Sequence, residues 1–326
     1  MPRPNPSAQV RKFNPDQDFT AYVDFLNAVS GHNGIDSATT EQEQRDYADM
    51  LTIDLNADRL VIDHPEQSDK LIAVGDVWQI NQNPSADLML LVHPEWRRQG
   101  VGSKLLSAAL AHANELDATA IDAYARPEQK EIQAFLEHYN FKVVSNCTGM
   151  EITVTKPFPK ADLPKNYTVR TYAELEGSQE DKLDLIVKAG NEFWGVLWGH
   201  KVTKDLELAR EVMRKNVLGN HDENAMFFLY DGDNYIGHDR VSFSEMPDGV
   251  KQGYGGGPPG LHPDWHTPEL AREFALVGLA WLYNQGCRQI AFMFWGESEE
   301  TLQAFKELGF TVSNFELGYQ LALTQK

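Results

Sequence analysis

Residues 93–102 read HPEWRRQGVG, and residues 262–271 read HPDWHTPELA. Both stretches begin with histidine, proline, an acidic residue and tryptophan, and only then diverge. The second stretch begins 169 residues after the first, and the same offset aligns much of the sequence around it. Similarity at one fixed offset indicates a repeated structural unit. The sequence therefore predicts an internal duplication, with one copy of the motif in each half.

The first half alternates predicted strands and helices around its copy of the motif. Alternating or continuous apolar runs predict strands at residues 8–12, 59–62, 71–80, 88–92, 119–124 and 141–154. Apolar residues at helical spacing predict helices at residues 18–29, 100–113 and 128–139. The strand at residues 88–92 leads into the motif, and a helix follows it. This order predicts a mixed α/β layer unit.

The second half repeats this order. Strands are predicted at residues 167–172, 225–230, 235–243 and 290–294, with another that ends at residue 261, and helices at residues 179–193, 270–281 and 299–308. Three prolines within residues 155–167 indicate a linker. We therefore predict an α/β fold with α+β mixed-sheet layers, made of an N-terminal domain at residues 1–154, a linker at 155–166 and a C-terminal domain at 167–326.

Composition and charge limit the classes of function. The chain has 326 residues and a formal net charge of −19. Such a charge disfavours nucleic acid and anionic membranes and favours cationic or amine partners, although it can also serve solubility alone. The two cysteines lie far apart without metal-ligand spacing, so we expect buried thiols and no metal. No apolar run is long enough to span a bilayer, which favours a cytoplasmic protein without a membrane partner.

The segment RRQGVG at residues 97–102 has the composition of an anion-binding site. A helix that begins at Gly100 presents unpaired backbone N–H groups and the positive end of its dipole. Gly100 and Gly102 lack the Cβ atoms that would keep a ligand from those amides. Because Arg97 and Arg98 add positive charge, the segment predicts a cradle for a diphosphate group. The alternative is a tight turn shaped by glycine, with solvated arginines.

These residues resemble those of a known family. The pattern V-x-P-x-x-R-x-x-G-x-G at residues 92–102 resembles the acyl-CoA-binding motif of the GNAT N-acetyltransferase superfamily. The segments FLEHYNF at residues 135–141 and AFKELGF at residues 304–310 are similar to a later segment of that family, LYEKLGF. The resemblance therefore extends over both halves. Tandem domains of this kind occur in the family, in mycothiol synthases for example.

The resemblance implies transfer of an acetyl group from acetyl-CoA, a co-substrate, to a primary amine of a small molecule. In that family the strand before the cradle separates from the next strand, and a backbone N–H near Leu90 or Leu91 would hold the thioester carbonyl oxygen. The amine attacks directly, so the mechanism needs neither a metal nor an enzyme nucleophile. The residues assigned to acetyl-CoA are Leu91, Val92, Arg97, Arg98, Gln99, Gly100, Val101, Gly102, Ser103 and Lys104.

The second copy of the motif lacks these features. His266 replaces the arginine, Glu269 and Ala271 replace the two glycines, and Pro268 removes an amide donor. A carboxylate about 4 Å from a phosphate charge costs about 4 kcal/mol at an effective dielectric constant near 20. We therefore expect acetyl-CoA to bind in the N-terminal domain alone. The second copy persists as architecture, in a pseudo-dimer within one chain that is compatible with a monomer.

Catalytic groups have weaker signals. A tyrosine in the LYEKLGF segment often protonates the leaving thiolate in this family, but Leu136 and Phe305 occupy that position here. Either another group donates this proton, or catalysis proceeds without a dedicated acid, because a CoA thiolate is a tolerable leaving group near neutral pH. Tyr139, one helical turn beyond Leu136, is a substitute candidate, and a core tyrosine is the alternative. Asp87, in the strand that leads into the cradle, is the candidate general base, with a surface charge as the alternative. Asp122 lies in the next strand, and we expect its side chain to face the other layer.

Two stretches of the second half leave alternatives open. Phe193, Trp194 and Trp198 fit a wall for an amine substrate or a contact between domains. The glycine-rich residues 254–260 include prolines and start no helix, so we expect an irregular bend and no nucleotide site. We predict an N-acetyltransferase. The alternative is a non-catalytic protein that binds CoA as a structural or sensory ligand, because both tyrosines and one cradle are missing.

Overall fold

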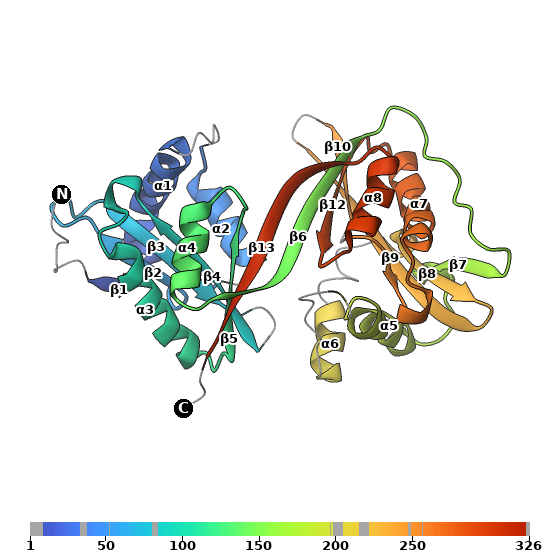
Figure 1. Ribbon diagram of the computed structural model, residues 1–326, viewed down its shortest axis with the longest axis horizontal. Coiled ribbons are helices and arrows are strands. Elements are labelled where there is room, and N and C mark those ends of the chain that lie inside the picture. The colour runs from blue at the N-terminus through green and yellow to red at the C-terminus, as the bar shows by residue number, and fades with distance from the viewer. Residues whose placement is uncertain are drawn as a thin grey trace. The chain divides into compact units, whose positions relative to one another are not determined.

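The computed structural model describes residues 9–32, 38–51, 53–79, 84–195, 197, 205–214, 222–246, 249–255 and 257–323. Internal contacts divide the chain into two compact units, drawn in Figure 1. Unit 1 consists of Met1–Ala123, Leu136–Lys142 and Tyr319–Lys326, and unit 2 of Tyr124–Phe135 and Val143–Gly318. Each unit therefore includes a segment from the other half of the sequence.

Unit 1 is a sheet with helices packed on it. Its strands neighbour one another in the order β1 (Val10–Lys12), β2 (Arg59–Asp63), β3 (Leu71–Trp78), β4 (Ser85–Val92), β5 (Ala120–Ala125) and then the end of β13 (Thr311–Ala322). Strands β1 to β4 pair antiparallel, whereas β4 and β5 are parallel. The helices are α1 (Pro15–His32), α2 (Glu41–Met50) and α3 (Val101–Glu115).

Strand β4 shows how the two layers of unit 1 divide. Leu91 packs against the apolar cluster that includes Phe19 of α1. Leu90 instead lies against Gly75, next to Leu105 of α3. Successive side chains of a strand point to opposite faces. The odd-numbered residues of β4 therefore face the α1 layer, and the even-numbered residues face α3.

A buried ion pair lies on the α1 face. Arg59 donates from Nε to Oδ1 of Asp76 at 2.7 Å and from Nη2 to Oδ2 at 2.8 Å, and both side chains are fully buried. The guanidinium group stacks over the ring of Tyr22 at 4.0 Å. Burial by itself lowers the pKa of Arg59, but the hydrogen bonds to Asp76 and the attraction of its negative charge together outweigh burial, so the pKa is raised. The pair joins β2, β3 and α1.

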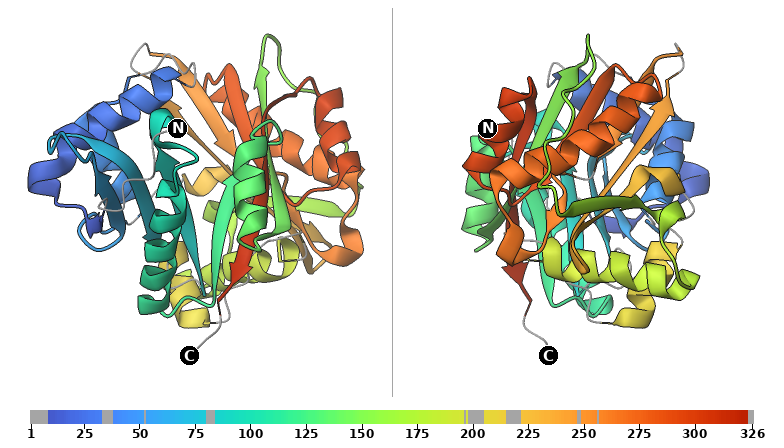
Figure 2. Two further views of the ribbon diagram at one scale, coloured as in Figure 1. Left: turned by 60° about the vertical axis from the view of Figure 1, so that its left-hand side comes forward. Right: turned by 90° about the vertical axis from the view of Figure 1, so that its right-hand side faces the viewer.

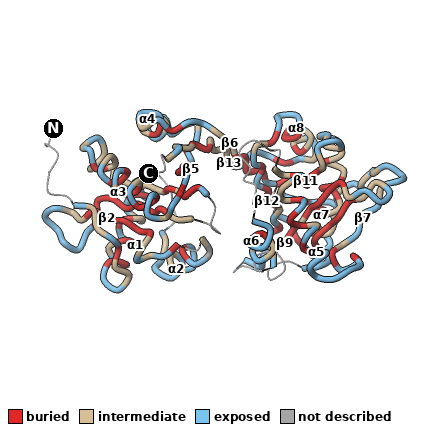
Figure 3. The backbone as a smooth tube through the Cα atoms, turned by 90° about the horizontal axis from the view of Figure 1, so that it is seen from below, coloured by how far each residue is buried: buried red, intermediate tan, exposed pale blue. Residues whose placement is uncertain are grey.

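Unit 2 has the same layered plan (Figures 1 and 2). Its strand order is β13, β6 (Lys142–Thr153), β12 (Gln289–Trp295), β10 (Lys251–Gly255), β9 (Asn234–Glu245), β8 (Met226–Asp231) and β7 (Tyr167–Thr171), and the short β11 (Gly260–Leu261) pairs with β9. The helices are α5 (Gln179–Lys188), α6 (Leu206–Met213), α7 (Pro268–Asn284) and α8 (Glu299–Glu307). Buried residues follow the strands within each unit, as Figure 3 shows.

The structure confirms the predicted mixed α/β fold, with particular differences. The polar sequence of α2, EQEQRDYADM, has no apolar stripe, and neither α2 nor α6 is predicted. The predicted helix at residues 179–193 divides into α5 and a π-helical turn at Ala189–Phe193. Residues 254–260 divide between the ends of β10 and β11, and residue 256 lies outside the described residues.

The division into units differs from the division along the sequence. Residues 155–166 contain no helix or strand. The helix α4 (Lys130–His138) is shared between the two units, and the last residues of the chain belong to unit 1. The predicted domain boundary lies between the two sequence repeats, whereas the two units are defined by contacts within the structure. The boundary at residues 155–166 therefore stays a prediction. Within the described ranges, no helix has both the length and the apolar composition that crossing a membrane requires.

Candidate functional site

The two copies of the His-Pro-acid-Trp motif adopt the same local structure. Pro94–Trp96 and Pro263–Trp265 each form one turn of 3-10 helix directly after a strand. In each copy the backbone N–H of the tryptophan donates to the backbone carbonyl of the histidine, at 2.8 Å in the first copy and 2.9 Å in the second. The shared residues therefore build the turn, and the chemical differences between the copies begin after the tryptophan.

The helix α3 begins with an open N-terminus. Gly100 occupies the N-cap position with a φ of +80°, which glycine adopts without strain. The first turn of α3 contains no acidic residue, and no side chain of the described residues caps it. A Cβ atom added at Gly100 would meet no described atom within 4 Å. The backbone N–H groups of the first turn therefore stand at the positive end of the helix dipole without a side-chain cap from the described residues.

The residues before Gly100 shape the loop that leads into α3. Arg97 donates from Nε to the Val92 carbonyl at 3.2 Å, which ties its guanidinium group to the end of β4. Gln99 donates from Nε2 to the Glu95 carbonyl at 2.7 Å. Arg98 has a left-handed φ of +60°, and its side chain is exposed. Arg97 and Gln99 thus order the loop, whereas Arg98 presents a cation to solvent.

Strands β4 and β5 separate before the cradle. Their parallel pairing runs from Ser85 with Ala120 to Asp87 with Asp122 and ends there. Beyond Asp87, β4 continues to Val92 in register with β3. The other edge of β4 can therefore offer backbone groups to a ligand over residues 88–92. This is the separation that the family resemblance implies.

The equivalent helix of unit 2, α7, begins with a closed N-terminus. The Thr267 hydroxyl accepts a hydrogen bond from the Leu270 N–H at 3.2 Å. Pro268 occupies the first helical position without an N–H group, and Glu269 adds a carboxylate to the first turn. The chain's own residues therefore cap this terminus, where phosphates of acyl-CoA would need N–H groups.

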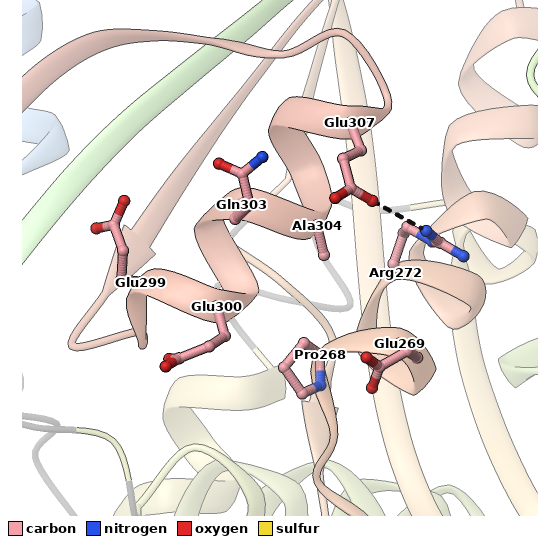
Figure 4. Close-up of a pocket in the computed structure, with 8 residues that line it drawn as sticks. All are labelled: Pro268, Glu269, Arg272, Glu299, Glu300, Gln303, Ala304 and Glu307. Atoms are coloured by element: carbon pink, nitrogen blue, oxygen red, sulfur yellow. Dashed lines mark ion pairs between the residues drawn. The ribbon is translucent and has the colours of Figure 1, made fainter.

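A groove of about 460 Å³ lies between the start of α7 and α8 (Figure 4). Arg272 is the one cation among its described lining residues, and it contacts Glu307 at 3.5 Å. The carboxylates that line the groove belong to Glu269, Glu299, Glu300 and Glu307. The surplus of negative charge opposes the binding of a diphosphate.

Trp194 covers the strand of unit 2 that corresponds to the end of β4. Its indole ring lies so close to Gly260 that a Cβ atom there would be 2.7 Å from the ring. Its Nε1 donates to the Pro258 carbonyl at 3.3 Å, and its ring meets His238 edge-on. Trp194 therefore packs within its own unit and leaves Gly260 no room for a side chain. Trp198 lies outside the described residues.

The two aspartates of β4 and β5 lie opposite each other at the last paired positions of these strands. Asp87 is half-buried on the α1 face. Asp122 is its cross-strand partner, and its carboxylate accepts from Ser85 Oγ at 2.7 Å. Asp122 therefore lies on the same face of the sheet as Ser85 and Asp87, and the expectation that it faces the other layer is wrong. Alternation within β5 does not show which residues of β4 share a face with Asp122, because the register between the two strands decides this. Gln320 donates to the second oxygen of Asp122 at 2.9 Å, a contact without any sequence signal.

Tyr139 lies just beyond the end of α4. Its side chain is half-buried, and its ring meets His138 edge-on with 5.0 Å between centroids. Leu136, at the position where the family often has tyrosine, is buried. The role of Tyr139 as acid stays a prediction, as does the role of Asp87 as base.

Two buried carboxyl groups of unit 2 have a raised pKa. Burial raises the pKa of Asp239 and of Glu297 in unit 2 to about 7. Within the described ranges, no three side chains of histidine, cysteine, aspartate or glutamate gather as they would around a metal ion. In unit 1, β4 contains the candidate base Asp87 and two of the predicted cofactor residues, Leu91 and Val92.

Comparison with known proteins singles out the same region. Residues 30–141, which contain the parting strands and the cradle, match the acetyltransferase (GNAT) family. The chain carries a GNAT acetyltransferase domain. A mycothiol acetyltransferase of Saccharomonospora viridis is 22% identical over 238 residues, which cover 71% of this chain and 72% of that protein. A mycothiol acetyltransferase of a Nocardioides species is 27% identical over 120 residues, which cover 37% of this chain and 39% of that protein.

Solved structures extend the likeness to the whole chain. A GCN5-related N-acetyltransferase from Sphaerobacter thermophilus has a TM-score of 0.71 at 18% identity, covering 96% of this chain and 95% of that chain. A tandem GNAT protein from the clavulanic acid biosynthesis pathway has a TM-score of 0.63 at 14% identity, covering 97% of this chain and 98% of that chain. These structures confirm the tandem GNAT fold. The family match confirms the predicted class of enzyme, an acyltransferase.

Proposed function

We propose that the chain transfers the acetyl group of acetyl-CoA to a primary amine of a small molecule, with acetyl-CoA held by unit 1. One observation carries this proposal: β4 parts from β5 after Asp87 and then leads into the open N-terminus of α3. A thioester needs a strand edge with available backbone groups, and a diphosphate needs clustered N–H groups. One continuous segment of unit 1 offers both.

The residues of unit 1 fit acetyl-CoA. The N–H groups in the first turn of α3 would hold the diphosphate, and Arg98 and Lys104 would add positive charge beside it. The edge of β4 at Leu91 and Val92 would bind the arm that carries the thioester. A backbone N–H near Leu90 or Leu91 would donate to the carbonyl oxygen, which gains negative charge as the amine attacks.

The chemistry needs one proton acceptor and one proton donor. The amine nitrogen attacks the thioester carbonyl carbon, a C–N bond forms, the C–S bond breaks, and CoA leaves as a thiolate. We assign the proton released by the ammonium group to Asp87 at the base of the cleft. Tyr139 is the candidate that protonates the thiolate. The net charge of −19 raises the local concentration of cationic acceptors relative to neutral ones.

Unit 2 is expected to bind no acetyl-CoA. The Thr267 cap and Pro268 remove N–H donors from the start of α7, and Glu269 opposes an anion there. Trp194 covers the strand at Gly260. The name shared by the two curated relatives, mycothiol acetyltransferase, supports acetyl transfer to a small molecule.

Calorimetry with acetyl-CoA, followed by thiol release with a panel of primary amines, tests the proposal. We expect one acetyl-CoA per chain and thiol release that depends on an amine. Two acetyl-CoA per chain would contradict the restriction to unit 1. Binding without thiol release across the panel would favour a non-catalytic CoA-binding protein, a second candidate that the buried Leu136 in place of tyrosine supports.

A further inference from the structure

The pairing of β4 with β5 ends at a buried carboxylate. Asp122 occupies the last position where β5 pairs with β4, and 5% of the residue is exposed. Its Oδ2 accepts from Ser85 Oγ at 2.7 Å, and its Oδ1 accepts from Gln320 Nε2 at 2.9 Å. A buried carboxylate needs such donors, because burial without them is strongly unfavourable. The two donors bind one oxygen each and so contribute to the orientation of this carboxylate.

These side chains meet where the strands part. Ser85 and Asp87 are two residues apart on one face of β4, and Asp122 lies opposite Asp87 on β5. The hydrogen bond from Ser85 to Asp122 therefore joins the first paired position of β4 to the last paired position of β5. It links the two strands directly beside Asp87, where their pairing ends.

Gln320 comes from the second half of the sequence. It lies in β13, 198 residues after Asp122, within the segment Tyr319–Lys326 that belongs to unit 1. Leu323 N–H donates to the Thr119 carbonyl at 2.8 Å, directly before β5 begins. The end of β13 is therefore the strand next to β5, and Gln320 and Leu323 add a side-chain and a backbone hydrogen bond to that pairing.

We propose that Gln320 is a positioning residue of the acyl-transfer site. It holds the Asp122 carboxylate against Ser85 and so maintains the point where β4 and β5 part, beside Asp87. The inference rests on the proposed function, because it concerns the cleft to which acetyl transfer is assigned. Under this proposal the second repeat has a role although the N-terminus of its helix α7 is closed. The repeat supplies β13, whose end lies beside β5 in the sheet of unit 1.

Loss of the Gln320 amide would leave Oδ1 of Asp122 buried without this donor. The carboxylate would turn toward another donor and displace the start of β5 relative to β4. A displacement of about 1 Å between reacting groups can cost about a hundredfold in rate. The binding of acetyl-CoA depends on α3 and the edge of β4, so its affinity is expected to stay unchanged. Turnover and affinity should therefore respond differently.

The test compares Gln320→Glu with the wild-type chain. This change keeps the shape of the side chain and replaces the amide donor with a second carboxylate. We expect kcat for the best amine of the panel to fall about tenfold or more, with the dissociation constant of acetyl-CoA within about twofold of wild type. Gln17→Glu, at an exposed position of α1, makes the same chemical change and is expected to leave kcat unchanged.

Combining Gln320→Glu with Asp122→Asn exchanges donor and acceptor across the same contact. If Gln320 acts by position, the hydrogen bond re-forms and kcat returns to within about threefold of wild type. Gln320→Met, which is similar in shape but uncharged, covers the case in which Gln320→Glu does not fold. It is expected to lower kcat while acetyl-CoA still binds.

Each outcome decides the inference. Wild-type kcat in folded Gln320→Glu, or no recovery in the folded double variant, overturns the role of Gln320 and leaves the proposed function intact. If the wild-type chain releases no thiol with any amine, the proposed function and this inference fail together.

Discussion

Gly100→Glu gives α3 the residue type that α7 carries at the equivalent position, Glu269. Gly100 stands at the N-cap with a φ of +80°, and no described atom lies within 4 Å of an added Cβ atom. The new side chain therefore fits without a clash, with its carboxylate where the diphosphate is expected. At about 4 Å and an effective dielectric constant near 20, the repulsion is about 4 kcal/mol, which weakens acetyl-CoA binding about a thousandfold.

Gly100→Ala separates the backbone effect from the charge effect. Any residue with a Cβ atom at this φ costs about 1 kcal/mol, mainly in the free energy of unfolding. Alanine introduces that cost without a charge or a capping group. We expect its affinity for acetyl-CoA to stay within about tenfold of wild type, which corresponds to about 1.4 kcal/mol.

Calorimetry of acetyl-CoA at low and high salt completes this test. The Debye length shrinks from about 10 Å at 0.1 M salt to about 3 Å at 1 M salt. High salt should therefore reduce the difference in acetyl-CoA affinity between Gly100→Glu and Gly100→Ala. Equal affinities of Gly100→Glu and Gly100→Ala would refute the assignment of the diphosphate to α3. The reverse change, Glu269→Gly, leaves the Thr267 cap and Pro268 in place, so we expect it to create no second site.

Three further predictions concern the packing of the units. Arg59→Met leaves Asp76 buried without its partner and should lower the free energy of unfolding in urea by about 3–5 kcal/mol, whereas adding Asp76→Leu should recover most of it; an unchanged midpoint would contradict this. Burial raises the pKa of Glu297 from its ordinary 4.5 to about 7, so its contribution to stability is complete below about pH 4.5 and is lost as the pH rises through about 7. In the wild-type chain the free energy of unfolding should therefore fall between roughly pH 5 and pH 8, and Glu297→Gln should reduce this fall by up to about 3 kcal/mol. The same pH profile of the unfolding free energy in both proteins would contradict this prediction. Trp194→Ala should cost about 2 kcal/mol by emptying the space over Gly260, yet leave one acetyl-CoA per chain, and a second binding event would show that Trp194 alone closes unit 2.

The cradle can be predicted from sequence because its chemistry is local. A strand, a turn, a left-handed glycine and the first turn of a helix are consecutive in the chain, and the types of residue at 97–102 indicate each of them. The same holds for its absence in the second half. Thr267, Pro268 and Glu269 close the start of α7 through local capping and charge, which the sequence shows directly.

The position of Asp122 opposite Asp87 could not be predicted in the same way. Alternation within β5 shows that Asp122 and Ile121 face opposite sides, but it does not show which of them shares a face with Asp87. That depends on the register between β4 and β5, which is a contact between strands far apart in sequence. The polar sequence of α2 likewise conceals a helix that begins with a capping box at Thr40.

The sequence by itself determined the duplication, through similarity at one fixed offset, and the alternation of strands and helices, through local periodicity. It also determined the glycine-rich helix start at residues 97–102 and its closed counterpart at 266–271, because each of these two depends on residues within about one helical turn of one another. Tertiary structure alone decided which half supplies the last strand of unit 1, and so brought Gln320 to Asp122 across 198 residues. The physical reason is that strand partners are selected by the packing of whole layers, and no local pattern in either segment records the partner.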